Sequence, residues 1–431
     1  MKKLLIILLL PLATQAQTLE VCMQSAERNY PLIKKYGLIS KTKELTLSNI
    51  QKGWLPLVSV SAQTSYQSAV TEWPSQMKAM YQQMGLEMQG LKKEQYRVGI
   101  DVQQTIYDGG SIRSKQDVSR LENDVQIEQT RVSLYEVRHR VTQLYFSVLL
   151  LDQQLQLYRD RETLLLKNED KLDKLFRHGA AAECDWKAVR AERLMASQAV
   201  VNIETQRKSL ARTLAEFCGM EYVSPQIPSH RVRQPSIGSQ DFVSLSHPQM
   251  RFFDARLSLA DAQERSLGIA IRPHVTLFAS GYYGYPGYNM FEDMIQRHGT
   301  LNGMVGLRLT WNISGLYTLK NDRAQINTNR QRIEIERDLF LFNSRLDIMK
   351  HDADIERFRA QLQTDDEIIT LRKAVRIASE SKLDHGIIVA SDLVRDINQE
   401  SAACIARATH EIEMWEAIYQ KMITTNEDIT H

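Results

Sequence analysis

The chain has 431 residues, and its 54 Lys and Arg nearly balance its 52 Asp and Glu, for a formal net charge of +2 at pH 7. Charged residues of both signs are spread along the sequence without a basic tract, which argues against a nucleic-acid-binding protein. The length would hold two or three ordinary domains and does not by itself choose a fold.

The N-terminus has the layout of a secretory signal peptide. Two lysines precede an apolar run over residues 4–12, and the small residues of 13–16 suggest cleavage before Gln17. We therefore expect residues 1–16 to be removed on export. The apolar run is shorter than the about 20 residues that a transmembrane helix needs, and no later stretch approaches that length. A mature chain that enters a membrane would have to do so as a closed β-barrel.

The four cysteines are widely spaced, at Cys22, Cys184, Cys218 and Cys404. An export compartment permits disulfides, but this spacing lacks the density of a disulfide scaffold. We expect free or half-buried thiols, and the sequence leaves open whether any of them pair. Processing as a lipoprotein at Cys22 is not expected, because the preceding Leu-Glu-Val lacks small residues.

An internal repeat covers most of the chain. At an offset of 207 positions, residues 98–100 align with 305–307, His178-Gly179 with His385-Gly386, and Asp185 with Asp392. Upstream the offset is 217, and it aligns Asn29-Tyr30-Pro31 with Ser246-His247-Pro248. The change of offset indicates a longer surface connection in the first copy, between about residues 66 and 96.

Each copy contains two windows in which apolar and polar residues alternate, the period of a strand with unlike faces. The expected strands cover about 57–66 and 97–107 in the first copy, and about 274–283 and 304–313 in the second. About ten residues are enough for a tilted strand to cross a bilayer. A water-soluble hairpin with one buried face is the alternative, but nothing else in the chain could cover its apolar face.

The apolar members of these windows are the expected lipid-facing positions: Val58, Val60, Val98, Ile100, Val102, Ile106, Val275, Leu277, Val305, Leu307, Leu309 and Trp311. The polar members would face a barrel lumen. Asp101 and Arg308 are among them and indicate a water-filled interior.

After each second strand the pattern changes to the 3.5-residue period of a coiled coil, most clearly from Leu134 to Tyr158. No Gly or Pro interrupts residues 111–178 or 317–385. We predict a long helix over each range, with a length of about 100 Å at about 1.5 Å per residue.

Glycine is expected to end each long helix, at Gly179 and Gly386, because it adopts the left-handed conformation readily. Return helices follow over 185–218 and 391–424, with Ser391-Asp392 as the expected N-cap of the second. A Pro- and Ser-rich linker covers 219–240.

Further helices are expected over residues 19–52, at the start of the first copy, and over 241–270, at the start of the second. The predicted organisation is a signal peptide (1–16), a first repeat (17–237) and a second repeat (238–431).

Four strands per chain cannot close a barrel alone. Two chains would give eight strands filled with side chains, whereas three would give twelve and leave room for water. We therefore expect a mainly α-helical trimer with a twelve-stranded membrane β-barrel, continued by a long α-helical coiled-coil barrel that would suit a conduit across the periplasm.

The order, spacing and duplication of these features resemble the TolC family of outer-membrane factors over essentially the whole mature length. The residues that carry the resemblance are Thr18-Leu19-Glu20, Asn29-Tyr30-Pro31, Gly53-Trp54-Leu55-Pro56, Tyr107-Asp108-Gly109-Gly110 and the two tips at 179–185 and 386–392. Gln104 and Trp311 stand where family members often carry Pro, and Leu316-Tyr317 replaces the Gly pair in the second copy. These departures affect the expected strand-to-helix geometry.

The resemblance implies a homotrimer in contact with outer-membrane lipid, with its helical part in the periplasm. It also implies docking of a periplasmic adaptor (a membrane fusion protein) and, through it, an inner-membrane transporter. The predicted function is a passive exit duct of a tripartite efflux or type I secretion system. The substrate, and whether the pump is driven by protons or by ATP, stay open.

In the family, the helix tips meet the adaptor and the tunnel narrows there. By position, the candidate adaptor contacts are His178, Gly179, Asp185, His385, Gly386 and Asp392. Helix termination alone also explains the glycines. The histidines could tune docking with pH, although tolerated exposed residues are the simpler explanation.

Asp173 and Glu380 precede the two tips by one to two turns and are candidate pore-gate residues. Three copies of each would form a negative ring that favours cations. A solvated outer helix face explains these acids equally well.

No residue pattern supports an enzyme: metal-ligand spacings, nucleophile motifs and phosphate-binding Gly loops are not found. We expect no cofactor, no metal and no nucleic-acid partner. The main alternative to a channel is a periplasmic or surface coiled-coil structural protein without a pore, which would extract without detergent and conduct no ions.

Overall fold

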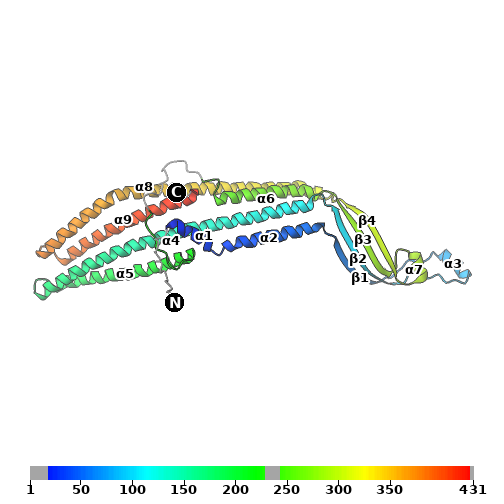
Figure 1. The fold of residues 1–431 in the computed structure, drawn as a ribbon, viewed down its shortest axis with the longest axis horizontal. Coiled ribbons are helices and arrows are strands. Elements are labelled where there is room, and N and C mark those ends of the chain that lie inside the picture. The colour runs from blue at the N-terminus through cyan, green and yellow to red at the C-terminus, as the bar shows by residue number, and fades with distance from the viewer. Residues whose placement is uncertain (1–17, 229–242, 428–431) are drawn as a thin grey trace, which may run out of the picture. The chain divides into compact units, whose positions relative to one another are not determined.

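Figure 1 shows the fold in a computed structural model that describes residues 18–228 and 243–427. The predicted signal peptide, residues 229–240 of the predicted linker and the last four residues lie outside this part of the chain. The described residues are mainly helical and include one four-stranded sheet. The chain divides into two compact units. The first unit comprises Met1–Gly37, Ile127–Phe253 and Ile335–His431, and the second Leu38–Gln126 and Asp254–Glu334.

The second unit contains the sheet, whose strands run antiparallel in the order β1-β2-β3-β4. Their bounds are β1 Leu57–Tyr66, β2 Glu94–Tyr107, β3 His274–Tyr285 and β4 Thr300–Thr310. The connection from β1 to β2, expected to be a surface loop, contains the helix α3 (Ser75–Gln83), and that from β3 to β4 contains α7 (Met290–Gln296). Strands β1 and β4 are the two edges of the sheet.

The chain leaves β2 and β4 by different turns. After β2, the carboxylate of Asp108 accepts hydrogen bonds from the Gly110 and Ile112 amides at 2.9 and 2.7 Å, while Gly109 and Gly110 have φ of +65° and +95°. The second copy carries Leu and Tyr in place of these glycines, and such residues avoid positive φ. There, β4 ends at Thr310 and the next helix begins at Gly315. Trp311, predicted as a strand residue, therefore lies just after the strand.

The helices outside the two strand connections are α1 Leu19–Asn29, α2 Ile33–Gln51, the short η1 Lys52–Trp54, α4 Ser111–Arg177, α5 Glu183–Cys218, α6 Pro248–Ala270, α8 Gly315–Asp384 and α9 Ala390–Thr425. The long helices α4 and α8 span 67 and 70 residues. They pair with the return helices α5 and α9, each of 36 residues, in two hairpins of the first unit (Figure 1).

Prolines change two of the predicted helices. The single helix expected over 19–52 is interrupted, because Pro31 disfavours helical geometry at Tyr30, whose ψ is 128°. The helix expected over 241–270 begins at Pro248, a residue suited to the first helical position because it lacks an amide hydrogen. The range 241–242 lies outside the described residues.

The main core of the first unit lies where α1 and the C-terminal ends of α5 and α9 pack on the middle of α4. Its largest fully buried side chains include Trp415, Tyr145, Tyr419 and Phe146. Lys421 is also buried, and its ammonium pairs with the Asp352 carboxylate at 2.8 Å. This core holds both ends of the described chain in one layer.

Candidate functional site

The tip of the first hairpin is a tight turn that closes on Gly179. This residue has φ of +72°, and the amides of Gly179 and Ala180 donate to the carbonyls of Phe176 and Leu175 at 2.9 and 2.8 Å. Such paired bonds satisfy carbonyls that the helix end leaves free. A Cβ on Gly179 would meet nothing within 4 Å, so the need for glycine is conformational and not steric.

The tip of the second hairpin repeats this geometry at the same offset of 207 positions. Gly386 has φ of +67°, and the amides of Gly386 and Ile387 donate to Leu383 and Lys382 at 3.0 and 2.9 Å. Both histidines that precede the glycines are exposed. The Nδ1 of His385 lies 2.7 Å from the Ser381 carbonyl oxygen.

The return helices begin earlier than expected. The N-cap of α9 is Val389, and no side chain caps it locally, so the predicted cap Ser391-Asp392 lies inside the first turn. The first hairpin nevertheless supplies a cap to the second: Asp185 Oδ1, from α5, accepts the amide of Ala390 at 3.2 Å. Asp392 instead pairs with Arg395 at 3.2 Å.

Apolar packing joins the two hairpins near their tips. The buried members of this cluster are Leu165, Leu172, Val189, Ala196, Ala390, Leu393 and Ile397. Lys171 and Asp384 form an ion pair between α4 and α8 just outside it. These contacts join hairpin to hairpin within one chain, and sequence periodicity identified neither Lys171 nor Asp384.

Both candidate gate acids pair with arginines one turn away on their own helices. Asp173 lies 2.8 Å from the Arg177 guanidinium, which is 73% exposed. Glu380 lies 2.8 Å from Arg376, which is 12% exposed and also pairs with Glu400 of α9. The second acid therefore belongs to a more enclosed network than the first.

One face of the sheet is apolar and exposed. Val60 and Val305 are 74% and 72% exposed, and the cross-strand pairs Val60–Ile100 and Leu277–Leu307 lie on this face. Of the other predicted lipid-facing residues, Val102 and Val275 are half-buried and the rest exposed.

The pairing of β2 with β3 is irregular at one end, near Ile106, which was predicted to face lipid. An irregularity between Thr105 and Tyr107 leaves Ile106 without a partner in β3 and sets Tyr107 opposite Val275. Beyond β4, the indole nitrogen of Trp311 donates to the Ile271 carbonyl at 3.0 Å. Trp311 is exposed, but it does not extend the apolar face as a strand residue.

The opposite face of the sheet is polar. Asp101 lies opposite Ser59 and Ser280, and Arg308 places its guanidinium 4.9 Å from the ring centroid of Phe278. Arg97 shares this face: it lies 4.0 Å over the Tyr282 ring and donates to Ser280 at 3.1 Å. Arg97 was not singled out from the sequence, although its two-residue spacing to Gly99 and Asp101 places it on the same face.

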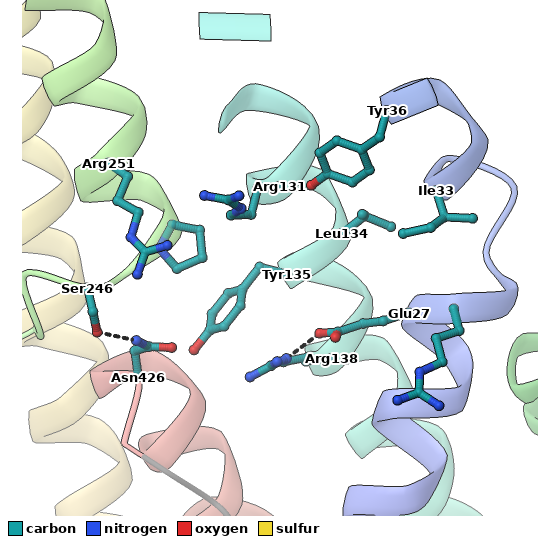
Figure 2. Close-up of a pocket in the computed structure, with 12 residues that line it drawn as sticks. Glu27, Ile33, Tyr36, Arg131, Leu134, Tyr135, Arg138, Ser246, Arg251 and Asn426 are labelled. Atoms are coloured by element: carbon teal, nitrogen blue, oxygen red, sulfur yellow. Dashed lines mark hydrogen bonds and ion pairs between the residues drawn. The ribbon is translucent and has the colours of Figure 1, made fainter. Parts of the chain in front are cut away.

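A pocket of about 400 Å³ lies in the first unit, between α1, α4, α6 and the end of α9 (Figure 2). Arg138 pairs there with Glu27, and the Tyr135 hydroxyl donates to the Ile423 carbonyl at 2.6 Å. Burial raises the pKa of the Tyr36 hydroxyl, and the nearby Arg131 acts against that shift. The Arg138–Glu27 ion pair thus holds α1 against α4, and the Tyr135 hydroxyl holds α9 against it.

Two further findings concern the described residues alone. They contain no group of three or more His, Cys, Asp and Glu side chains that could hold a metal ion. None of their helices is long and apolar enough to cross a membrane.

Comparison with protein families gives a match for part of the chain. Residues 48–220, which include the first two strands and the first hairpin, match the outer membrane efflux protein family. The predicted resemblance is confirmed by this match over residues 48–220. Comparison with curated protein sequences gives no match.

Three solved structures share the fold of this chain. CusC, from a study of transmembrane channel formation, matches with a TM-score of 0.70 and 11% identity over 94% of this chain and 91% of its own. The CmeC outer membrane channel of Campylobacter jejuni gives 0.68 and 13%, over 96% and 87%. VceC, an outer membrane protein of Vibrio cholerae, gives 0.67 and 11%, over 94% and 95%. The chain thus shares the mainly helical fold of these proteins.

Proposed function

We propose that the chain is one subunit of an outer-membrane channel, a passive exit duct for a tripartite efflux or type I secretion system. The family match and the shared fold support an efflux channel. The observation that carries the membrane part is the exposed apolar face of the sheet, where Val60, Val305 and Leu309 are each more than two-thirds exposed. A row of exposed apolar residues is costly in water and favourable in lipid.

The edges of the sheet support a homotrimer. Strands β1 and β4 each have one side without a partner strand in the sheet, and natural proteins rarely leave such edges open. If β4 of one copy paired with β1 of the next, three copies would close a barrel of twelve strands. Its polar inner face would carry Asp101, Arg97 and Arg308 into a water-filled lumen.

The helix tips are the proposed docking surface for a periplasmic adaptor, which would connect the duct to an inner-membrane transporter. Besides the tip residues His178, Gly179, Asp185, His385, Gly386 and Asp392, the second tip exposes two apolar side chains. Ile387 is 70% exposed and Val389 is 54% exposed. Exposed apolar residues at a hairpin end are typical of a contact surface.

We further propose that Asp173 and Glu380 line the narrow end of the helical duct. Their arginine partners modify the expected charge of such a ring. Arg177 is mostly exposed and screens Asp173 weakly, whereas Arg376 is enclosed and holds Glu380 closely. Asp173 would therefore contribute more to cation preference than Glu380.

Conductance measurements test this function. The purified protein should cross-link as a trimer and form ion-conducting pores in planar bilayers, and Asp173→Asn should reduce cation preference more than Glu380→Gln. Val60→Asn and Val305→Asn should impair membrane assembly, whereas Gln63→Asn on the other face should not. Extraction without detergent, together with no conductance, would support the structural coiled-coil protein instead.

Affinity capture tests the partners. Mild cross-linking of intact membranes should recover an adaptor together with an inner-membrane transporter, and an Ile387→Asp variant should lose them while still forming pores. Recovery of a proton-driven or an ATP-driven transporter would decide between drug efflux and type I secretion.

A further inference from the structure

Two of the four cysteines lie against each other in the core of the first unit. Cys22, on α1, and Cys218, the last residue of α5, are 0% and 4% exposed and belong to the same apolar cluster. The Cys218 thiol donates to the Cys22 carbonyl oxygen, with 3.5 Å between sulfur and oxygen. All four cysteines are free thiols in this structure.

The contact between the two cysteines is held in place by their neighbours. On α1, the Asn29 amide donates to the carbonyls of Glu216 and Phe217 at 3.0 and 3.3 Å. The ring of Tyr30 stacks on that of Phe217, with 6.1 Å between centroids. These contacts fix where α1 lies on the end of α5, and so they hold the Cys218 thiol against the backbone of Cys22.

The remaining two cysteines are less buried. Cys184 is exposed near the first tip, and Cys404 is half-buried in the middle of α9. The adjacent Cys218 side chain, together with burial, raises the pKa of the Cys22 thiol in the folded protein.

We propose that Cys22 and Cys218 are oxidised to a disulfide after export, which ties the N-terminal helix to the end of the first return helix. In this step the thiolate of one of the two cysteines attacks the disulfide of a protein thiol oxidant in the export compartment. The other cysteine then attacks the mixed disulfide. The new sulfur–sulfur bond forms, the bond of the oxidant breaks, and the oxidant leaves with two electrons and two protons as a dithiol.

Burial determines when the bond forms and how it behaves. An oxidant cannot reach sulfurs that are at most 4% exposed, so oxidation takes place while the exported chain folds and before α1 is covered. Once covered, the disulfide is shielded from small thiols. It should therefore resist reductant in the native protein and yield to it only after unfolding.

Counting free thiols tests the proposal on the full-length protein, purified from outer membranes without reductant and unfolded before reaction with a maleimide of known mass. We expect two labels, on Cys184 and Cys404, and four labels after reduction. Reductant applied before unfolding should still leave two. A double variant Cys184→Ser/Cys404→Ser should take no label without reduction and two with it, and Cys22→Ser should take three in either case.

The inference rests on export to an oxidising compartment, as the proposed function requires, and the two can fail separately. The chain without residues 1–16 and started by Met, made in the cytosol, should take four labels. Four labels on protein recovered from the outer membrane would overturn the disulfide and leave the channel intact. A lipid attached at Cys22 would overturn it as well, and intact mass would show this directly.

Discussion

Both return helices end at a residue in the left-handed conformation. The asparagine that donates a hydrogen bond at this point comes from α1 in the first copy, and in the second copy it is the end residue itself. The first, α5, ends at Gly219 with φ of +64°, and the amide of Asn29 reaches in from α1 to its last carbonyls. The second, α9, ends at Asn426 with φ of +56°, and its own amide donates to the Ser246 hydroxyl at 2.9 Å. By the offsets of the repeat, Gly219 aligns with Asn426 and Asn29 with Ser246.

The ion pairs between long and return helices show the same kind of exchange. Glu169 of α4 pairs with Arg193 of α5, whereas at the aligned positions Arg376 of α8 pairs with Glu400 of α9. Backbone conformations that few residues can adopt are thus kept in both copies, while each side-chain contact needs only a complementary pair and can be satisfied in either orientation. Each prediction below compares a residue of one copy with its counterpart or a matched control.

The largest predicted effect is a loss of stability at low pH. It arises at His247, which aligns with Tyr30 of the first copy. Burial, and to a lesser degree the nearby His139, lowers the pKa of His247 to about 4, and its Nδ1 accepts the Gln249 amide at 3.1 Å. The folded state thus keeps this imidazole neutral, while the unfolded chain takes up a proton below its ordinary value of about 6.5. Stability is lost as pH falls from about 6.5 to about 4, by about 3 kcal/mol.

Denaturation in detergent, followed by circular dichroism at pH 7 and at pH 4, measures this loss. His247→Asn keeps an acceptor for Gln249 but does not titrate, so it should lose about 3 kcal/mol less than the wild type over this range. Glu136, Asp347 and His139 line the same cavity and are present in both proteins, so the comparison isolates the part of the loss that depends on His247. His178→Asn, at the exposed tip, should behave as wild type. A wild type and His247→Asn variant with the same pH dependence would refute the argument.

The next prediction exchanges the helix ends. A Cβ on Gly219 would lie 2.5 Å from Asn29 Cγ, so Gly219→Asn should destabilise by about 2 kcal/mol through overpacking. Asn29→Ser removes the obstructing side chain and recreates the arrangement of the second copy. The double variant should therefore recover at least half of the loss. Asn426→Gly is the control and should change stability by less than about 1 kcal/mol.

A third prediction compares the exchanged ion pairs. Removing Arg376 leaves Glu380 and Glu400 without their cation, with side chains 28% and 17% exposed. Removing Glu169 leaves Arg193, which is 22% exposed and has a long side chain that can reach water. We expect Arg376→Ala to cost about 2 kcal/mol and Glu169→Ala about half of that. Equal losses would show that the surroundings of the two pairs do not matter.

Much of the fold could be predicted because its signals are local. The alternation over residues 57–66 coincides with β1, and the absence of Gly and Pro over 111–178 and 317–385 anticipates α4 and α8 to within about two residues. The break at Pro31 was also visible in the sequence, but the prediction continued one helix through it. Strand β4 ends earlier than predicted, a few residues before Leu316 and Tyr317, which replace the two glycines of the first copy.

The candidate site was less predictable, because its contacts join residues far apart in sequence. Gly179 and Gly386 could be identified at the tips because a helix end needs a left-handed residue. No local pattern shows that Lys171 reaches Asp384, or that Cys22 meets Cys218 across 196 positions. Pairs of this kind depend on how helices pack, and a single sequence does not specify that.

The smallest predicted effect tests the proposed trimer through the tips. Within one chain, Asp185 accepts the amide of Ala390, the first residue of α9. The repeat aligns Asp392 with Asp185 and Glu183, the first residue of α5, with Ala390. In a closed ring of hairpins, Asp392 would then accept the Glu183 amide of a neighbouring copy. Asp185→Ala should cost about 1 kcal/mol of stability, the usual value of a helix cap, in assembled and dissociated protein alike.

Asp392→Ala should differ between those two states. In the dissociated chain it removes only a surface pair with Arg395, which is 61% exposed, and should cost less than about 0.5 kcal/mol. In the assembled ring it should cost about 1 kcal/mol, as its counterpart does. Denaturation before and after dissociation by dilution in detergent separates the cases. A small cost in both states would mean that the hairpins of neighbouring copies do not meet as those within one chain do, and the trimer would have to close through its sheet alone.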